Sequence, residues 1–258
     1  MRTSNLFIAV SLISVFAFKP IENWLIEKHK AYTFYYTSAD QKHKKECVEL
    51  MDNGVKFVKT FFNEPFKKEF AVYIHPNRRS LDTTWQRDFK MPEFRSECWM
   101  VASGMATKLD IISPITWDKE SCEHSYSEKI KTQQLINHEL FHVFHGQLNA
   151  SPDFSDVDNI DWFVEGMAAY ASGQCDSLRM AQVKKAIDEN KVPTTLDKFW
   201  TGKLKYGLSG SVVKYIDVTY GRKKLRALLG FNKKAQILKE ISCSEEELLV
   251  KWKEFMMK

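Results

Sequence analysis

The chain has 258 residues, of which 44% are hydrophobic and 28% charged, with 10 Gly and 7 Pro. This balance excludes a disordered, collagen-like or low-complexity chain, and the length allows one large domain or two lobes. The formal net charge of +5 is small and spread along the sequence. Because a nucleic-acid-binding protein is expected to cluster its basic residues, nucleic acid is not expected among the partners.

The first 18 residues have the pattern of an export signal. Arg2 precedes an apolar run from Leu6 to Phe18, which is shorter than the roughly 20 residues that span a bilayer. Small residues suit cleavage after Ala17. An uncleaved signal anchor and a buried N-terminal helix are the alternatives. We therefore expect residues 1–18 to be a signal peptide or signal anchor, and the protein to be secreted or periplasmic, with membrane attachment only if this segment is retained.

The next part of the chain, up to Pro114, mixes strand and helix patterns. Alternating apolar residues predict strands, and apolar residues at helical spacing predict a helix that starts near Ser38 and ends before Pro65. A shorter helix is predicted from Ser80 to about residue 89. The predicted strands are 31–37, 70–75, 99–102 and 105–112, the last two joined tightly around Gly104.

The second half of the chain is predicted to be helical. Capping-box patterns begin at Ser38, Ser125 and Ser244 and indicate helix starts. The predicted helices are 126–147, 161–173, 178–190, 207–220, 222–229 and 245–257. No flexible linker separates the halves. We therefore expect an α+β fold that forms one catalytic unit over 19–258, with an α/β lobe containing a mixed sheet at about 31–147 and a helical lobe at about 148–258.

Five cysteines remain after the signal segment, and none lies in a C-x-x-C pair, so a cysteine-based zinc knuckle is not expected. Export would permit disulfides. Cys98 and Cys122 flank a predicted strand and are candidates for a pair. Buried free thiols agree equally well with the sequence.

The sequence His138-Glu139-Leu140-Phe141-His142 is an H-E-x-x-H motif within a predicted helix. Residues four apart lie on one helix face, roughly 5–6 Å apart at Cβ, so both imidazoles can bind one Zn²⁺. Glu139 lies about 100° round the helix and can reach a water on the metal without binding the metal itself. The opposite side of the helix is apolar, at Ile136, Leu140, Val143 and Phe144.

Glu165 is the candidate third ligand, on the predicted helix 161–173. Trp162 and Phe163 anchor this helix, and small residues such as Gly166 and Ala168 allow it to pack closely. A carboxylate among such residues is costly to bury unpaired, and a bound cation explains it. A salt bridge to Lys or Arg is the alternative explanation.

H-E-x-x-H followed by W-x-x-E-G-x-A-x-Y resembles the gluzincin metallopeptidases, the peptidase MA-like group related to thermolysin and the aminopeptidases. The second motif is matched at Trp162, Glu165, Gly166, Ala168 and Tyr170. A weaker likeness extends over about residues 31–257, and only the two central motifs are specific. The resemblance implies a two-lobed zincin fold with zinc in the cleft between an α/β lobe and a helical lobe, and it implies peptide-bond hydrolysis.

The sequence differs from related metallopeptidases at two places, and these differences limit what the resemblance implies. The metzincin branch is excluded because His145 and Leu148 stand where it needs Gly and His, and we expect His145 to be an ordinary or supporting histidine rather than a ligand. Thermolysin-like enzymes carry a carboxylate one turn after the ligand glutamate, which orients a histidine. Here that place is Ala169, so the support for the ligands must come from elsewhere.

These observations predict a zinc-dependent peptidase that acts on a peptide or protein substrate. His138, His142 and Glu165 hold one Zn²⁺ per chain, water takes the fourth position, and Glu139 is the general base. Tyr206, placed before the predicted helix 207–220 where a glycine lets its ring swing, is the expected oxyanion donor.

Tyr170 is expected to serve packing instead, and an extended peptide is expected to pair with an edge strand near 108–112. One alternative is a catalytically inactive zinc-binding member of the same fold that acts as a peptide- or protein-recognition module. The other is a metal-free, non-enzymatic α/β protein.

Overall fold

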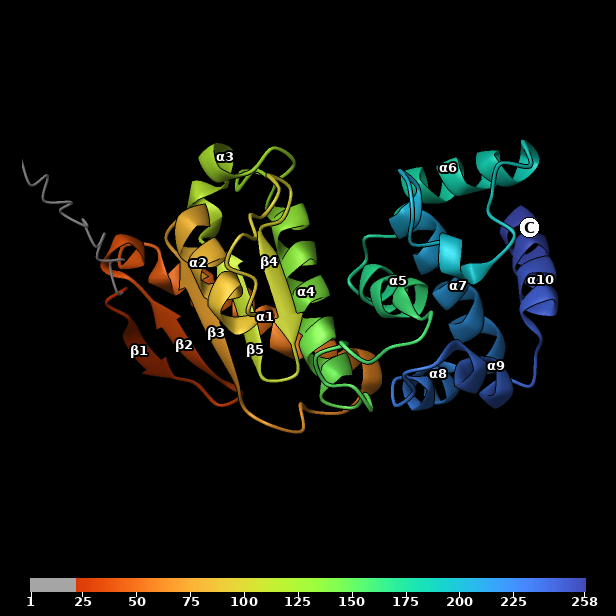
Figure 1. Cartoon of the computed structure of the whole chain (residues 1–258), viewed down its shortest axis with the longest axis horizontal. Helices are drawn as coiled ribbons and strands as arrows, with labels where there is room; N and C mark the ends of the chain where they lie inside the picture. Colours follow the sequence, from red (N-terminus) through yellow and green to blue (C-terminus); the bar gives the residue numbers. More distant parts are fainter. Residues whose placement is uncertain (1–21) are drawn as a thin grey trace, which may run out of the picture.

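The computed structural model describes residues 22–258, so the predicted signal segment at 1–18 lies outside the described residues. Within this part of the chain, no helix is both long and apolar enough to cross a membrane. The fold is α+β, with one mixed sheet followed by a series of helices (Figure 1). The strands are β1 (Leu25–Lys28), β2 (Tyr32–Tyr36), β3 (Phe70–His75), β4 (Ala102–Met105) and β5 (Lys108–Ile112).

The helices fall into two groups along the chain. Those that accompany the sheet are α1 (Lys44–Phe62), α2 (Arg78–Asp88), α3 (Trp117–Glu120) and α4 (Lys129–Gly146). Those that follow it are α5 (Asp161–Ala171), α6 (Ser177–Asp188), α7 (Lys205–Tyr220), α8 (Arg222–Leu228), α9 (Lys234–Glu240) and α10 (Glu245–Met257).

The sheet has the strand order β1-β2-β3-β5-β4. The central strands β2, β3 and β5 are parallel, and the outer strands β1 and β4 are antiparallel to their neighbours. The predicted edge strand near 108–112 is therefore wrong, because β5 lies between β3 and β4. The tight connection is also shifted, since Gly104 lies inside β4 and pairs with Leu109.

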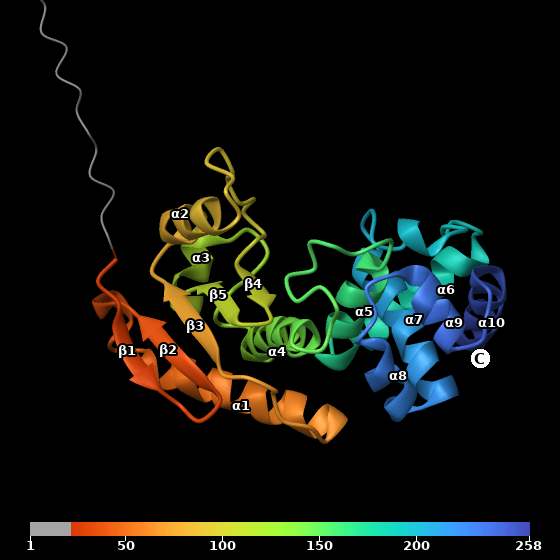
Figure 2. The same ribbon diagram turned by 60° about the horizontal axis from the view of Figure 1, so that its bottom comes forward.

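The two faces of the sheet carry different helices. Gly104 and Leu109 face α4, because a Cβ at Gly104 would lie only 2.2 Å from the backbone oxygen of Glu139. Helices α1 and α4 lie side by side on this face, and α2 lies on the other (Figure 2). On the α2 face the indole of Trp85 donates a hydrogen bond to Asp110 over 3.3 Å. Because side chains alternate between the two faces of a strand, the neighbouring residues Leu109 and Asp110 face different helices.

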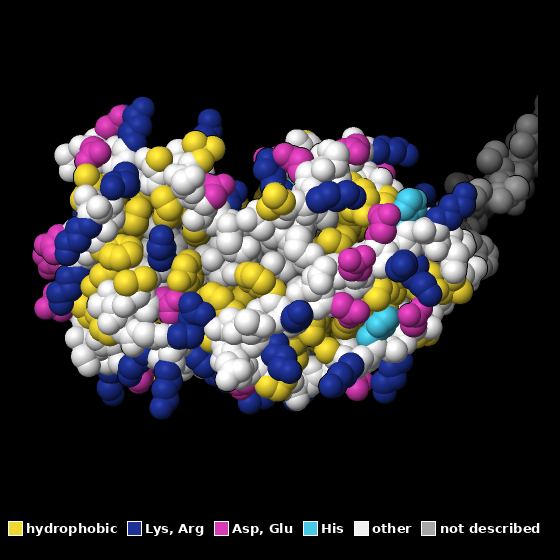
Figure 3. All heavy atoms as spheres, turned by 180° about the vertical axis from the view of Figure 1, so that it is seen from behind, with side chains coloured by type: hydrophobic (Ala, Val, Ile, Leu, Met, Phe, Trp, Pro, Cys, Tyr) yellow, Lys and Arg dark blue, Asp and Glu magenta, His cyan; other side chains and the backbone are white. Residues whose placement is uncertain are grey.

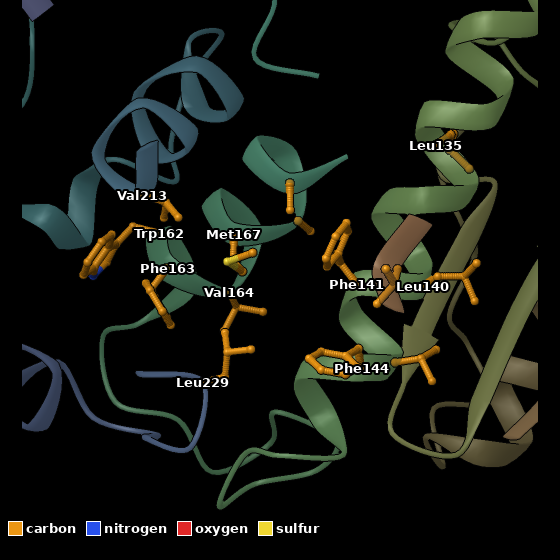
Figure 4. Close-up of a cluster of buried hydrophobic side chains, with 14 of the residues drawn as sticks. Leu135, Leu140, Phe141, Phe144, Trp162, Phe163, Val164, Met167, Val213 and Leu229 are labelled. Carbon is orange, nitrogen blue, oxygen red and sulfur yellow. The ribbon is translucent and has the colours of Figure 1, made fainter. Parts of the chain in front are cut away.

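Helix α4 occupies the middle of the molecule. Its apolar residues Ile136, Leu140, Val143 and Phe144 are all fully buried, as the motif's amphipathic pattern predicts. Figure 4 shows Phe141 and Phe144 pointing from α4 toward the apolar side chains of α5. Buried residues of the sheet, α4 and the later helices form one continuous hydrophobic cluster, so the two groups of helices share a core.

The predicted capping boxes can be compared with the observed starts of the helices. At Ser244 the predicted capping box forms, with hydrogen bonds exchanged between Ser244 and Glu247. The patterns at Ser38 and Ser125 are wrong as caps. Ser38 opens a short 3-10 turn before α1, and the Ser125 hydroxyl accepts from the backbone of Ser127 instead. The chain also contains β1, α3 and α9, which the sequence patterns did not predict.

Two arginine side chains of α8 contact the end of α1 and the residues just after it. Glu64, just after α1, makes a bidentate pair with Arg226, with N···O distances of 2.6 and 2.9 Å. Arg222 donates to the backbone oxygen of Phe61 over 2.7 Å, and its guanidinium lies 3.5 Å from the centre of the Phe61 ring. These contacts hold the end of a sheet-covering helix against the later helical segment.

Cys98 and Cys122 form a disulfide, with their Cα atoms 5.4 Å apart. This decides between the two possibilities that the sequence left open for these residues. The bond ties the segment before β4 to the segment after α3. Cys47, Cys175 and Cys243 are free thiols.

Surface charge is dispersed on the face drawn in Figure 3, where Lys and Arg side chains lie among Asp and Glu side chains. This distribution agrees with the even spread of charge along the sequence.

Candidate metal centre

His138 and His142 lie on the same face of helix α4. Their four-residue spacing places both imidazoles one above the other, and their Nε2 atoms lie 3.0 Å apart. Both residues are buried, because α4 is enclosed by β4 on one side and α5 on the other. Two buried imidazole nitrogens this close cannot both carry a proton without repulsion, so the pair is suited to a shared cation.

Helix α5 supplies the third member of the group. One carboxylate oxygen of Glu165 lies 3.4 Å from Nε2 of His138 and 3.6 Å from Nε2 of His142. Ligands bound at roughly 2.0–2.2 Å to one ion can be at most about 4.4 Å apart, so all three separations suit a single Zn²⁺. The sequence prediction that these three side chains converge is consistent with this geometry.

The interactions between Glu165 and the two histidines offset the effect of burial on the pKa values of Glu165 and His142. Burial by itself raises the pKa of Glu165, but His142 and His138 outweigh it and hold the pKa well below its ordinary value. Burial lowers the pKa of His142, but Glu165 and then Glu139 more than offset it and raise the pKa. The carboxylate is therefore ionised and faces two imidazoles, which is the donor set that zinc prefers.

One of the two histidines lacks a hydrogen bond that would orient its ring. The Nδ1 atom of His138 is buried without a hydrogen-bond partner among residues 22–258. Zinc-binding histidines usually donate this second N–H to a carboxylate or carbonyl. The buried Ala169, one turn after Glu165, offers no such group, as the sequence indicated.

His145 lies outside the candidate group of His138, His142 and Glu165. It is buried between the rings of Phe154 and Phe163, with ring centres 5.1 and 5.8 Å away. Its Nε2 atom lies 3.4 Å from the amide of Asn149. Burial lowers the pKa of His145 to about 3, so it is a neutral packing residue.

The three residues lie in a cleft with a volume of about 380 Å³. Strand β4 forms one wall, and its residue Gly104 allows the strand backbone to approach α4 closely. Glu139 lines the same cleft and is only partly buried, so its carboxylate is accessible beside His138, His142 and Glu165. The cleft also contains Asp153 and Asp161, two carboxylates that do not join the group.

Tyr206 lines the cleft, but the reason given from sequence for its placement is wrong. It lies in the first turn of α7 rather than before the helix, and the adjacent Gly207 is buried against Val183. Its ring is held instead by Trp200, with ring centres 4.8 Å apart, and lies 6.2 Å from the ring of His138. Burial, followed by Glu165 and Glu139, raises the pKa of Tyr206, so its hydroxyl stays protonated and can donate.

Tyr170 has the packing role that was expected. Its hydroxyl donates to Asp217 over 2.7 Å, and its ring meets the Phe61 ring edge-on at 6.0 Å. Asp217 in turn pairs with Arg222. The hydrogen bond between Tyr170 and Asp217 joins α5 to α7.

A second polar cluster lies under α2. His75 is 3.0 Å from the Ser80 hydroxyl and 2.9 Å from Asp110. All three side chains are buried, so the serine is not presented to a substrate despite its partners. The cluster fixes α2 to β3 and β5. Asn77 caps α2 by accepting from the backbone of Ser80, so the helix begins at Arg78 and not at Ser80 as the sequence predicted.

The cleft lining includes residues that sequence reasoning missed, among them Trp99, Trp200 and Lys205. Trp200 and Lys205 lie in one short segment, but Trp99 is about a hundred residues away, so no local spacing connects it to them.

A comparison with protein-family models found no match, and a search of curated proteins found no related sequence.

Proposed function

We propose that the protein is a zinc-dependent metallopeptidase with a two-lobed zincin fold, similar to the gluzincins. The observation that carries this proposal is the convergence of His138, His142 and Glu165 in a cleft that also contains Glu139. The gluzincin resemblance of the two motifs supports the same function.

The proposed reaction is hydrolysis of a peptide bond. His138, His142 and Glu165 would hold zinc, which lowers the pKa of water and polarises the scissile carbonyl when bound. Glu139 accepts a proton from the attacking water on its carboxylate and passes it to the leaving amine nitrogen. Tyr206 donates its hydroxyl proton in a hydrogen bond to the developing oxyanion.

Strand β4 is the proposed substrate-binding strand. It is one of the two outer strands of the sheet, and no other strand within residues 22–258 pairs with its free side. It also lines the cleft beside α4. An extended peptide can add to such an edge through main-chain hydrogen bonds, which suits a peptide substrate of varied sequence.

The disulfide between Cys98 and Cys122 supports the proposal that the protein is exported. Disulfides persist in oxidising compartments and are rare in reducing ones. A secreted or periplasmic peptidase is consistent with both this bond and the signal-like pattern of residues 1–18.

The test is the substitution Glu139→Gln. We expect it to retain about one zinc per chain while peptide hydrolysis falls by roughly 10²–10⁴-fold, because an amide cannot accept the proton. Elemental analysis and a quenched-peptide assay, with and without chelator, measure both quantities.

Glu128→Gln, at the start of the same helix, is the matched control. Near-normal turnover in Glu139→Gln would refute the mechanism. Absence of hydrolysis by the zinc-loaded wild type would favour a recognition module.

A further inference from the structure

We propose that a basic recess beside the metal centre is a carboxylate-binding subsite, which selects peptides with a carboxylate close to the cleaved bond. This inference rests on the proposed peptidase function. The basic recess has a volume of about 490 Å³ and is lined by Arg179, Lys203, Lys205, Trp99 and Tyr206, among others. Trp99, Lys205 and Tyr206 also line the metal cleft, so the two hollows adjoin.

Lys205 is held in place without a carboxylate partner. Its ammonium nitrogen lies 4.8 Å from the ring centre of Trp99, 4.7 Å from Trp200 and 5.3 Å from Tyr206. Three aromatic rings fix the position of a cation, but they do not replace hydrogen-bond acceptors for its three N–H groups. No ion pair involves Lys205 within residues 22–258. It is therefore a positioned charge that can pair with a ligand.

Arg179, on α6, is the second cation. Its guanidinium lies 5.4 Å from the ring centre of Tyr206, on which it packs. One of its nitrogens donates to the backbone oxygen of Gln174 over 2.7 Å, and in the described chain the group has no carboxylate partner. The remaining N–H groups suit the planar, two-oxygen geometry of a carboxylate.

The charge of the basic recess differs from that of the cleft. Its cations are Arg179, Lys203 and Lys205, and its acidic lining residue is the exposed Glu123. The adjoining cleft shares Lys205 but also contains the carboxylates Glu139, Asp153, Asp161 and Glu165, of which a bound zinc ion would neutralise Glu165. A negatively charged group on a substrate is therefore attracted to the basic recess and repelled by Asp153 and Asp161 on the cleft wall, which favours one arrangement of a bound peptide.

The distances place this group close to the cleaved bond. The Tyr206 ring lies 6.2 Å from the His138 ring and 5.4 Å from Arg179, so one aromatic side chain separates the metal-binding group from the basic recess. An extended peptide rises roughly 3.3 Å per residue. A carboxylate one or two residues from the cleaved bond can therefore reach the basic recess.

The test uses the full-length, zinc-loaded protein and matched quenched peptides. One set carries Glu or Gln at each position within three residues of the cleaved bond, and a second set has a free or an amidated C-terminus. We expect kcat/KM to be at least about tenfold higher for the carboxylate form at one position than for its amide. Dependence on the side chain or on the terminus identifies which carboxylate is bound.

The variants Lys205→Met and Arg179→Met should reduce this ratio toward one, and Lys205→Arg should largely restore it. Lys185→Met, which removes a charge from α6 outside the basic recess, is the matched control and should keep the wild-type ratio. Equal kcat/KM for acid and amide peptides in the wild type would overturn the subsite while leaving the peptidase proposal intact.

A binding measurement separates the two proposals. Calorimetry can measure how tightly the same acid and amide peptides bind to the Glu139→Gln variant. This measurement does not depend on turnover. Tighter binding of the acid peptide that is lost in Glu139→Gln/Lys205→Met supports the subsite even if the wild type cleaves nothing. Equal binding of both peptides overturns it.

Discussion

Glu165 illustrates how a single side chain can define a site. It stands on a different helix from His138 and His142, yet its carboxylate faces both imidazoles. The two histidines were predictable because their relation is local, four positions along one helix. Glu165 was predictable because it falls in a second short motif. The cleft residues Trp99, Trp200 and Lys205 were not predictable, because only the fold brings Trp99 to the segment 200–205 and this segment to the cleft.

Glu165→Ala should lose most of the zinc, because two imidazoles alone leave the ion under-coordinated. Elemental analysis after dialysis against a weak chelator measures the metal content. Asp161→Asn, which changes another carboxylate in the same cleft, should keep its zinc. Full zinc occupancy in Glu165→Ala would remove Glu165 from the set of ligands.

Tyr206→Phe should lower kcat by at least about tenfold, because it removes the hydroxyl that we propose as the donor to the oxyanion. The ring contacts with Trp200 and the nearby cations remain, so zinc content and thermal stability should stay unchanged. Steady-state kinetics and thermal unfolding check both statements. Wild-type kcat in this variant would show that the oxyanion donor lies elsewhere.

At the scale of whole elements, the sequence patterns predicted most strands and helices but misplaced the sheet edge. Alternation identified 105–112 as a strand, yet it carries no information about which strand lies outermost. Strand order depends on long-range pairing, here of β5 with both β3 and β4. The residue that reveals the arrangement is Gly104, which indicated a turn in the sequence but permits close packing of β4 on α4.

Gly104→Ala tests this packing. The added Cβ would lie 2.2 Å from the backbone oxygen of Glu139 and 3.1 Å from Cβ of His142, so strand or helix must move. We expect a loss of about 1–3 kcal/mol in the free energy of unfolding, measured by chemical denaturation, and a lower kcat/KM. Ser103→Ala, the preceding residue in β4, is the control and should change little. Unaltered stability of Gly104→Ala would mean that β4 stands farther from α4.

At the scale of the whole molecule, the Glu64–Arg226 pair should make stability depend on pH. Hydrogen bonds from Arg226 and, to a smaller extent, from Lys67 outweigh burial and lower the pKa of Glu64 to about 2, against 4.5 for the free side chain. Because the folded-state pKa is depressed, the pair stabilises the fold above about pH 4.5 and loses this contribution as the pH falls toward 2.

Glu64→Gln should therefore cost about 1–2 kcal/mol of unfolding free energy at pH 7 and progressively less below pH 4.5. Urea denaturation across this pH range measures the difference. Glu69→Gln is the control, because Glu69 makes only a 3.6 Å pair with Lys28 between two exposed side chains. A cost for Glu64→Gln that is the same at all pH values would contradict this assignment.

The disulfide between Cys98 and Cys122 encloses β4, β5 and α3 within one covalent loop. Proteolytic cleavage of the backbone anywhere inside this loop therefore leaves the two fragments joined. Such a clipped molecule would run as one band on a gel without reductant and as two bands with it. A molecule cut in this loop by a protease would thus keep β4, the strand beside His138, His142 and Glu165, attached after the first cut.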